Sequence, residues 1–193
     1  MKRGSTLFAV LALALSIVLV AAGCGASGDK EKAKEYMAAA DAGFEKLEAQ
    51  SEELGELIED SLTELMTAMA TGQAPDPQKI NDAVDKIKSA ADDMLAMADQ
   101  VTADYGMILT LTGVDDYASY AELMISANEG SAEALTTVLD YLEKLAKGLA
   151  DGSLQPDQIS ETMMEFASEM DVLQKEIDSL EKEAEKLKKD KSL

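Results

Sequence analysis

The chain has 193 residues, 47% apolar and 28% charged, which fits one or two domains with a hydrophobic core. Three prolines, few aromatic residues and many Ala, Leu and Glu favour helix over an all-β fold or disorder. Thirty-eight acidic residues against 17 basic ones give a formal net charge of −21, and Arg3 is the only arginine. Such a chain repels a phosphate backbone, so no nucleic-acid partner is expected.

The N-terminus has the pattern of a secretory signal peptide. Residues 1–6 carry two positive charges, and residues 7–22 form an apolar run interrupted only by Ser16. This run is shorter than the roughly 20 residues that a membrane-spanning helix needs. Small residues and Cys24, the only cysteine, follow directly.

Residues Ala22–Cys24 resemble the lipobox of bacterial lipoprotein precursors, in which the cysteine is diacylated on sulfur and becomes the first residue after cleavage. The resemblance implies removal of residues 1–23, a diacylglycerol anchor on Cys24, and a short tether over residues 24–28. It also implies attachment to the cell membrane or outer membrane, facing outside the cytoplasm. Ala21 departs from the usual branched aliphatic residue. Ordinary cleavage and an uncleaved anchor are the two alternatives.

Breaks in the remaining sequence predict four long helices. Gly residues followed by Asp76–Pro77 and by Pro156 mark two of the breaks, and Gly113 with Asp115 as a cap marks the third. The expected helices span residues 29–70, 77–111, 115–150 and 156–190.

Apolar residues spaced alternately by four and three run along the second and fourth helices and indicate heptad seams. The seam of the second helix comprises Ile80, Val84, Ile87, Ala91, Met94, Ala98, Val101, Tyr105 and Ile108, and that of the fourth comprises Ile159, Met163, Phe166, Met170, Leu173, Ile177, Leu180, Ala184 and Leu187.

The first and third helices also match each other when shifted by 80 residues, so the chain reads as two similar helical hairpins, over residues 29–111 and 115–190. A hairpin cannot bury its seam alone. The prediction is therefore an all-α fold, an elongated antiparallel four-helix bundle about 50 Å long. Gly130 is a candidate kink in the third helix.

An up-down-up-down bundle places both termini at one end. Eight lysines would gather there, either facing an anionic membrane surface or compensating the helix dipole. They are Lys30, Lys32, Lys34, Lys182, Lys186, Lys188, Lys189 and Lys191. The two hairpin loops would form a tip at the far end, and loops often carry binding residues.

An acidic ridge at i, i+4 spacing runs along the first helix and comprises Glu48, Glu52, Glu56, Asp60 and Glu64. Like charges at this spacing destabilise a helix slightly. Antiparallel packing of the second helix is expected to bring Lys86 and Lys88 near Asp60. The ridge, together with Asp76 and Asp157 at the tip, is a candidate docking surface for a basic partner or divalent cations. A solvated face is the plainer interpretation.

No enzyme chemistry or cofactor is expected. The chain has no histidine, which removes His-based triads, the usual zinc sites and the Glu-x-x-His motif of di-iron bundles. Its methionines fit core positions better than a Cu(I) site. The first hypothesis is a membrane-anchored interaction or structural module with a protein partner in the cell envelope.

The sequence is compatible with two other functions. One is a ligand-binding bundle that resembles periplasmic sensor domains, with a pocket near Tyr117, Tyr120 and Tyr141. The other is self-association through the heptad seams.

Overall fold

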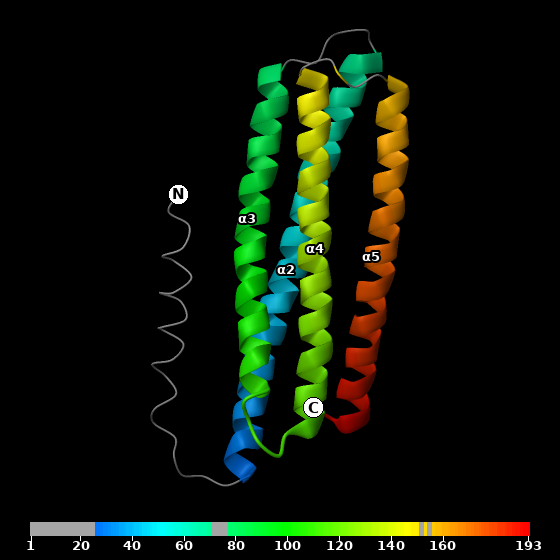
Figure 1. Ribbon diagram of the computed structural model, residues 1–193. Helices are drawn as coiled ribbons and strands as arrows, with labels where there is room; N and C mark the ends of the chain where they lie inside the picture. The colour runs from blue at the N-terminus through cyan, green and yellow to red at the C-terminus, as the bar shows by residue number, and fades with distance from the viewer. Residues whose placement is uncertain (1–25, 71–76, 151–152, 154–155) are drawn as a thin grey trace.

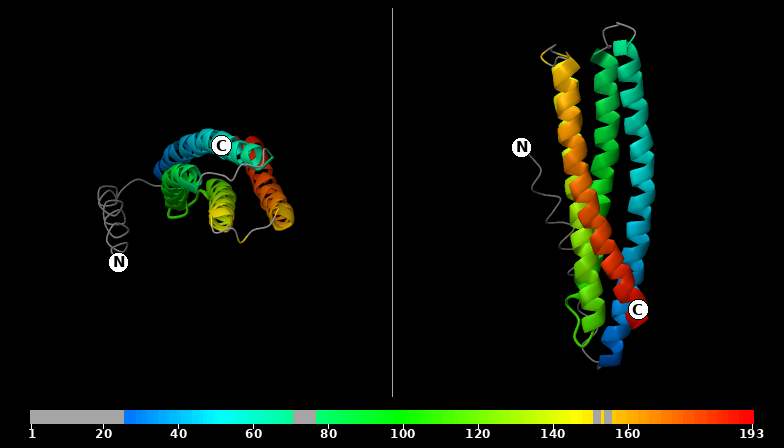
Figure 2. Two further views of the ribbon diagram at one scale, coloured as in Figure 1. Left: turned by 90° about the horizontal axis from the view of Figure 1, so that it is seen from above. Right: turned by 90° about the vertical axis from the view of Figure 1, so that its right-hand side faces the viewer.

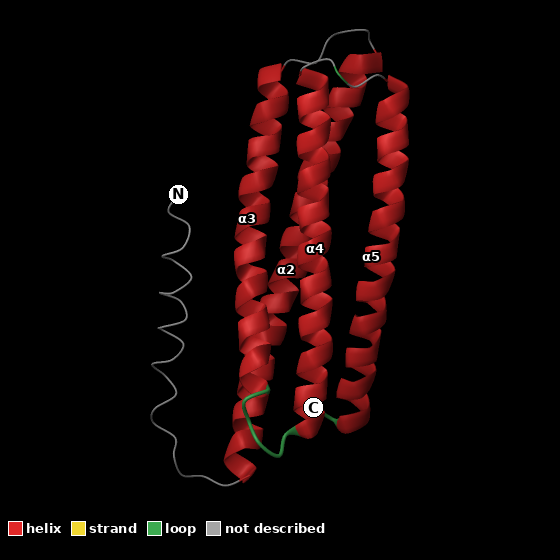
Figure 3. Cartoon of the chain, in the orientation of Figure 1, coloured by secondary structure: helices red, strands yellow, loops and turns green. Residues whose placement is uncertain are grey.

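The computed structural model describes residues 26–70, 77–150, 153 and 156–193 of the chain. These residues form four long helices, α2 (Ala26–Ala70), α3 (Pro77–Ile108), α4 (Asp115–Ala150) and α5 (Pro156–Lys191). The helices alternate in direction and lie side by side as an elongated bundle (Figures 1 and 3). The start of α2 and the end of α5 lie at one end, here called the terminal end, and the opposite end is called the turn end (Figure 1). The predicted all-α bundle of two antiparallel hairpins is confirmed.

The helix boundaries agree with the glycine and proline breaks of the sequence, with local differences at the start of α2 and the end of α3. α2 begins at Ala26, so residues 26–28 of the expected tether are helical. The carboxylate of Asp29 in the first turn stabilises this start, because it lies near the positive end of the helix dipole. α3 ends at Ile108 instead of 111, because the next three amides bond to carbonyls three residues earlier and tighten the last turn. Gly113 then reverses the chain at a φ of 70°.

Asp115 is not the cap of α4 that the sequence suggests. The carbonyl of Val114 accepts the first helical hydrogen bond, from the Ala118 amide at 2.9 Å, so Val114 occupies the cap position. The Val114 side chain is 4% exposed, and its burial in the core fixes where the helix starts. Asp115 and Asp116 lie in the first turn, where carboxylates stabilise the helix dipole.

The core follows the predicted seam most fully on α3, and α4 contributes a second row of buried residues. The α3 seam is buried continuously from Ile87 to Ile108, and Tyr105 is the largest fully buried side chain in the described residues. The α5 seam is less covered, since Phe166, Met170 and Leu173 are only half-buried. The buried α4 residues of the core cluster are Tyr117, Tyr120, Ala121, Met124, Tyr141, Leu142 and Leu145.

The four helices do not close into a symmetric bundle. α2 packs on α3, α3 on α4 and α4 on α5, while α2 also approaches α4. Among the described residues, no Cα atom of α2 comes within 8 Å of one in α5. α5 crosses obliquely, and its last turns approach the beginning of α2 (Figure 2). The side between α2 and α5 is therefore bridged by side chains at the terminal end.

Two helical glycines set close approaches between neighbouring helices. A Cβ atom at Gly43 of α2 would lie 2.7 Å from the Cγ2 atom of Val101 on α3, and one at Gly130 of α4 would lie 3.1 Å from the Cγ1 atom of Ile177 on α5. α4 continues through Gly130 as one helix and is not split there. Gly130 serves packing, because a Cβ atom at this position would press against Ile177 and require a small shift of α5.

A polar group also joins α3 and α4 inside the core. Asn128 is 1% exposed, and its Nδ2 atom donates to the Ala98 carbonyl at 2.7 Å and to the Thr102 hydroxyl at 2.8 Å. Sliding α4 along α3 would leave these groups without partners. Asn128 therefore fixes the register of the two helices.

Candidate functional site

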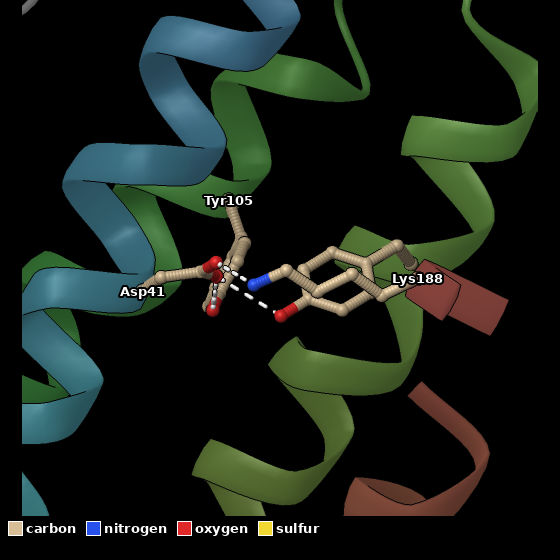
Figure 4. Close-up of polar contacts among 4 residues, drawn as sticks. Asp41, Tyr105 and Lys188 are labelled. Carbon is tan, nitrogen blue, oxygen red and sulfur yellow. Dashed lines mark hydrogen bonds and ion pairs between the residues drawn. The ribbon is translucent and has the colours of Figure 1, made fainter. Parts of the chain in front are cut away.

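Asp41 is the centre of a polar cluster to which all four helices contribute (Figure 4). Its Oδ1 atom accepts hydrogen bonds from the hydroxyls of Tyr105 on α3, at 2.6 Å, and Tyr120 on α4, at 3.0 Å. Its Oδ2 atom accepts from the Nζ atom of Lys188 on α5 at 2.6 Å. We call Asp41, Tyr105, Tyr120 and Lys188 the Asp41 clasp. It ties the start of α2 to the end of α5 at the terminal end of the bundle.

The electrostatics of the clasp favour neutral tyrosines around one carboxylate. Burial, and next the hydrogen bond to Asp41, raise the pKa of Tyr105 far above its usual value of 10.0. Burial, and next the charge of Asp41, also raise the pKa of Tyr120. The rings of the two tyrosines meet edge to face with centroids 6.0 Å apart, and the Nζ atom of Lys188 lies 5.5 Å from the Tyr120 centroid, within cation–π range.

The hydroxyls of the clasp are engaged inside the bundle. Both tyrosine hydroxyls donate to Asp41, and Tyr105 is 0% exposed, so neither hydroxyl is directed at an open site. The sequence indicated two members of this cluster, Tyr105 and Tyr120, since the hydroxyl of a buried tyrosine needs a hydrogen-bond partner. It did not show the acceptor, because Asp41 follows the buried residue Ala40 and resembles an ordinary surface acid in the sequence.

The aromatic side chains proposed for a ligand pocket are packed against protein. Tyr117 and Tyr120 are 3% and 4% exposed and belong to the core cluster. Tyr141 stacks on Phe166 of α5 with ring centroids 4.2 Å apart. Burial raises the pKa of Tyr141, whose hydroxyl has no hydrogen-bond partner in the described part of the chain.

An open hollow of about 830 Å³ lies elsewhere, between α3 and α4 near the turn end. Its lining mixes both signs of charge, including Lys88, Lys147, Asp140 and Glu143. Lys88 forms an ion pair with Glu143 across this hollow.

The acidic ridge of α2 does not form one flat face. Glu48, Glu52, Glu56 and Asp60 are all exposed, but residues four apart on a helix drift by about 40° per step. Glu48 lies on the side of α2 that faces α5, where it raises the pKa of Glu181, after the larger effect of burial. Later members of the ridge turn away from α5.

Other predictions about the ridge have different outcomes. The expected approach of Lys88 to Asp60 is wrong, because Lys88 faces α4 and pairs with Glu143. Asp76 lies outside the described residues, and the side chains of Glu64 and Asp157 lie outside the described part as well.

The lysines of the terminal end are partly engaged in ion pairs. Lys32 lies 3.8 Å from Asp29, Lys182 3.5 Å from Asp178, and Lys191 2.8 Å from Asp116. Lys188 belongs to the clasp. Half of the eight lysines expected at this end therefore have an acidic partner within the protein, which lowers the positive charge that the end can direct at a surface.

Cys24, the expected lipid attachment site, lies outside the described residues. Within the described residues, no helix combines the length and apolar character needed to cross a membrane. The same part of the chain contains no group of three acidic, His or Cys side chains placed to hold a metal ion. Comparison with protein-family models, curated proteins and solved structures found no match to this chain.

Proposed function

We propose that the protein is a membrane-anchored lipoprotein outside the cytoplasm that acts as a helical interaction module for a protein of the cell envelope. The observation that carries the proposal is the arrangement of the chain ends. α2 begins and α5 ends at the terminal end, so an anchor on Cys24 would attach there and the turn end would project away from the membrane (Figure 1). Helices of 32 to 45 residues would project the turn end about 50 Å.

The distribution of stabilising contacts supports a division between the two ends. The terminal end contains the Asp41 clasp and the Lys191–Asp116 ion pair. Large apolar side chains of α5 are exposed near the turn end and at mid-helix, with Met164 65% and Val172 61% accessible, and Leu109 at the terminal end is 43% accessible. Exposed apolar side chains of this size supply contact area for a protein partner.

The sensor alternative has weaker support. It requires a polar-lined space among the helices near Tyr117, Tyr120 and Tyr141, yet all three are buried in side-chain packing. Asp41 already accepts the Tyr120 hydroxyl. A ligand would have to displace these contacts in order to bind at that place.

Two experiments in a bacterial host test the proposal. Mass spectrometry of the mature N-terminus should show an acylated Cys24, and Cys24→Ala should move the protein from the membrane fraction to the soluble fraction. A photo-crosslinking residue at Glu56 or Met164 near the turn end should capture one recurrent envelope protein. The same residue at Ala39 or Ala103, both exposed near the terminal end, is the matched control.

An unmodified cysteine on a soluble protein would overturn the anchor. Equal capture from both ends, or capture of the protein alone, would overturn the interaction role and favour a spacer or a small-molecule sensor.

A further inference from the structure

Among the described side chains, α2 and α5 meet in the Asp41 clasp, through the ion pair of Asp41 with Lys188. Asp41 of α2 and Lys188 of α5 face each other, because they form an ion pair at 2.6 Å. Glu48 and Glu181 lie seven residues from them on the same two helices. Steps of seven residues keep a helix on nearly the same side. Further steps of seven from Glu48 and Glu181 therefore lead to residues on the same side of α2 and α5, closer to the turn end.

These residues form what we call the distal seam. It comprises Ser51 and Gly55 on α2 and Ala167, Met170 and Gln174 on α5. Ser51, Gly55, Ala167 and Gln174 are exposed, and Met170 is half-buried. In a closed bundle such positions pack against each other, as Gly130 and Ile177 do on α4 and α5. Here α2 and α5 leave them uncovered.

The space beside Gly55 shows this directly. A Cβ atom added at Gly55 would meet no atom within 4 Å among the described residues, whereas one at Gly43, twelve residues earlier on α2, would lie 2.7 Å from Val101. Half-buried apolar side chains lie next to the distal seam, namely Ile58 on α2 and Phe166 and Leu173 on α5. The distal seam thus combines small residues, open space and an apolar margin.

The charge around the distal seam is mainly negative, and Lys175, which follows Gln174, pairs with Asp171 of the same helix. Residues 47–70 contain seven acidic residues and no basic one, and residues 156–174 contain five acidic residues and no basic one. Glu48 and Glu181 oppose each other across the gap. Two copies of this surface would repel each other, as would an anionic membrane, so both are unfavourable occupants.

We propose that the distal seam binds an amphipathic helix of a protein partner, with an apolar stripe against Ile58, Phe166 and Leu173 and with Lys or Arg along its flanks. The apolar stripe would cover the half-buried margin, and the small residues at Ser51, Gly55 and Ala167 would let the partner backbone approach closely. The basic flanks would offset the acidic residues of both helices and speed association. This inference rests on the proposed interaction role and identifies the chemistry of the partner.

Binding of defined peptides to the full chain in mild non-ionic detergent tests the inference. The probe is a fluorescent helical peptide of about 18 residues with a leucine stripe and lysine flanks. One control peptide replaces the lysines by glutamates, and a second has the same composition with the stripe scrambled. Fluorescence anisotropy gives the dissociation constants at low and high salt.

A pair of glycine variants assigns the binding to the distal seam. Gly55→Trp places a large side chain in the seam, and Gly106→Trp is the matched control, since a Cβ atom meets nothing within 4 Å at either position. Circular dichroism checks that both variants keep their helix content. Analytical ultracentrifugation reports whether either variant changes the oligomeric state.

The lysine peptide should bind about tenfold or more tightly than either control peptide. Gly55→Trp should weaken this binding by about tenfold or more, and Gly106→Trp should change it by less than about twofold. Equal binding of the scrambled peptide, or no effect of Gly55→Trp, would overturn the inference. A dimer that Gly55→Trp dissociates would also overturn it, because a second copy would then occupy the seam. Failure of peptide binding while Cys24 is acylated and the turn end captures a partner would leave the proposed function intact.

Discussion

Removal of the Asp41 carboxylate should destabilise the bundle more than any comparable change at its surface. Asp41→Ala leaves the hydroxyls of Tyr105 and Tyr120 without an acceptor, at positions that are 0% and 4% exposed. A buried donor left unsatisfied costs about 1–3 kcal/mol. The Lys188 side chain is 40% exposed and can return to water, so its ion pair adds at most about 1 kcal/mol.

Because these contacts share one carboxylate, their costs do not add fully, and the expected loss is about 3 kcal/mol in the free energy of unfolding. For a protein of this size, a loss of this magnitude lowers the melting temperature by about 6–12 °C. Urea and thermal unfolding of the full chain in detergent, followed by circular dichroism, measure the change. Tyrosine fluorescence provides a second probe, since the chain has no tryptophan.

Two matched variants separate the contributions to the clasp. Asp60→Ala removes an exposed carboxylate from the same helix and should change stability by less than about 0.5 kcal/mol. Lys188→Met removes the ion pair but keeps both tyrosine hydrogen bonds, so it should cost about 1 kcal/mol or less. The reasoning is refuted if Asp41→Ala costs no more than Asp60→Ala, or if Lys188→Met costs as much as Asp41→Ala.

Further predictions concern helix packing and pH. Gly43→Ala should lower the free energy of unfolding by about 1–3 kcal/mol, because its Cβ atom would overlap Val101. Gly55→Ala lies in open space and should raise this free energy by about 0.5–1 kcal/mol. Thermal unfolding that gives the opposite order would contradict the packing. Burial and neighbouring carboxylates raise the pKa of Glu181, so the folded state gains stability as the pH falls toward the ordinary value of 4.5. Glu181→Gln should therefore stabilise the protein at neutral pH by less than about 1 kcal/mol. Urea titrations should show this gain becoming smaller in acid, and a gain that stays constant would argue against the raised pKa. The two tyrosines that donate to Asp41 have raised pKa values in the folded state. Their contribution to the free energy of unfolding is therefore complete below pH 10.0 and is lost above it, because the tyrosines of the unfolded chain ionise there while the folded ones stay neutral. Urea titrations from about pH 9 to about pH 11 should show stability falling by up to about 1.4 kcal/mol per pH unit for each tyrosine, and a flat profile would exclude their burial as neutral groups.

The sequence by itself determined the helices and their order along the bundle. Heptad spacing is a local property, and glycine with proline at the breaks ends and starts helices through backbone geometry alone. Pro77 and Pro156 accordingly open α3 and α5. Short loops between long helices then leave an antiparallel bundle as the way to bury the seams.

Only the tertiary structure decided which polar side chains meet and which side of the bundle stays open. Asp41 and Lys188 are 147 residues apart, and their contact depends on how far α5 rotates and crosses toward α2. Lys88 likewise selects Glu143 of α4 over the acids of α2. A heptad pattern determines which face of a helix is buried. It does not determine the exact rotation of the helix, and this rotation decides which partner a residue at the edge of the buried face meets. Close contacts such as Gly130 against Ile177, where the missing side chain lets α5 approach α4, contribute to setting that rotation.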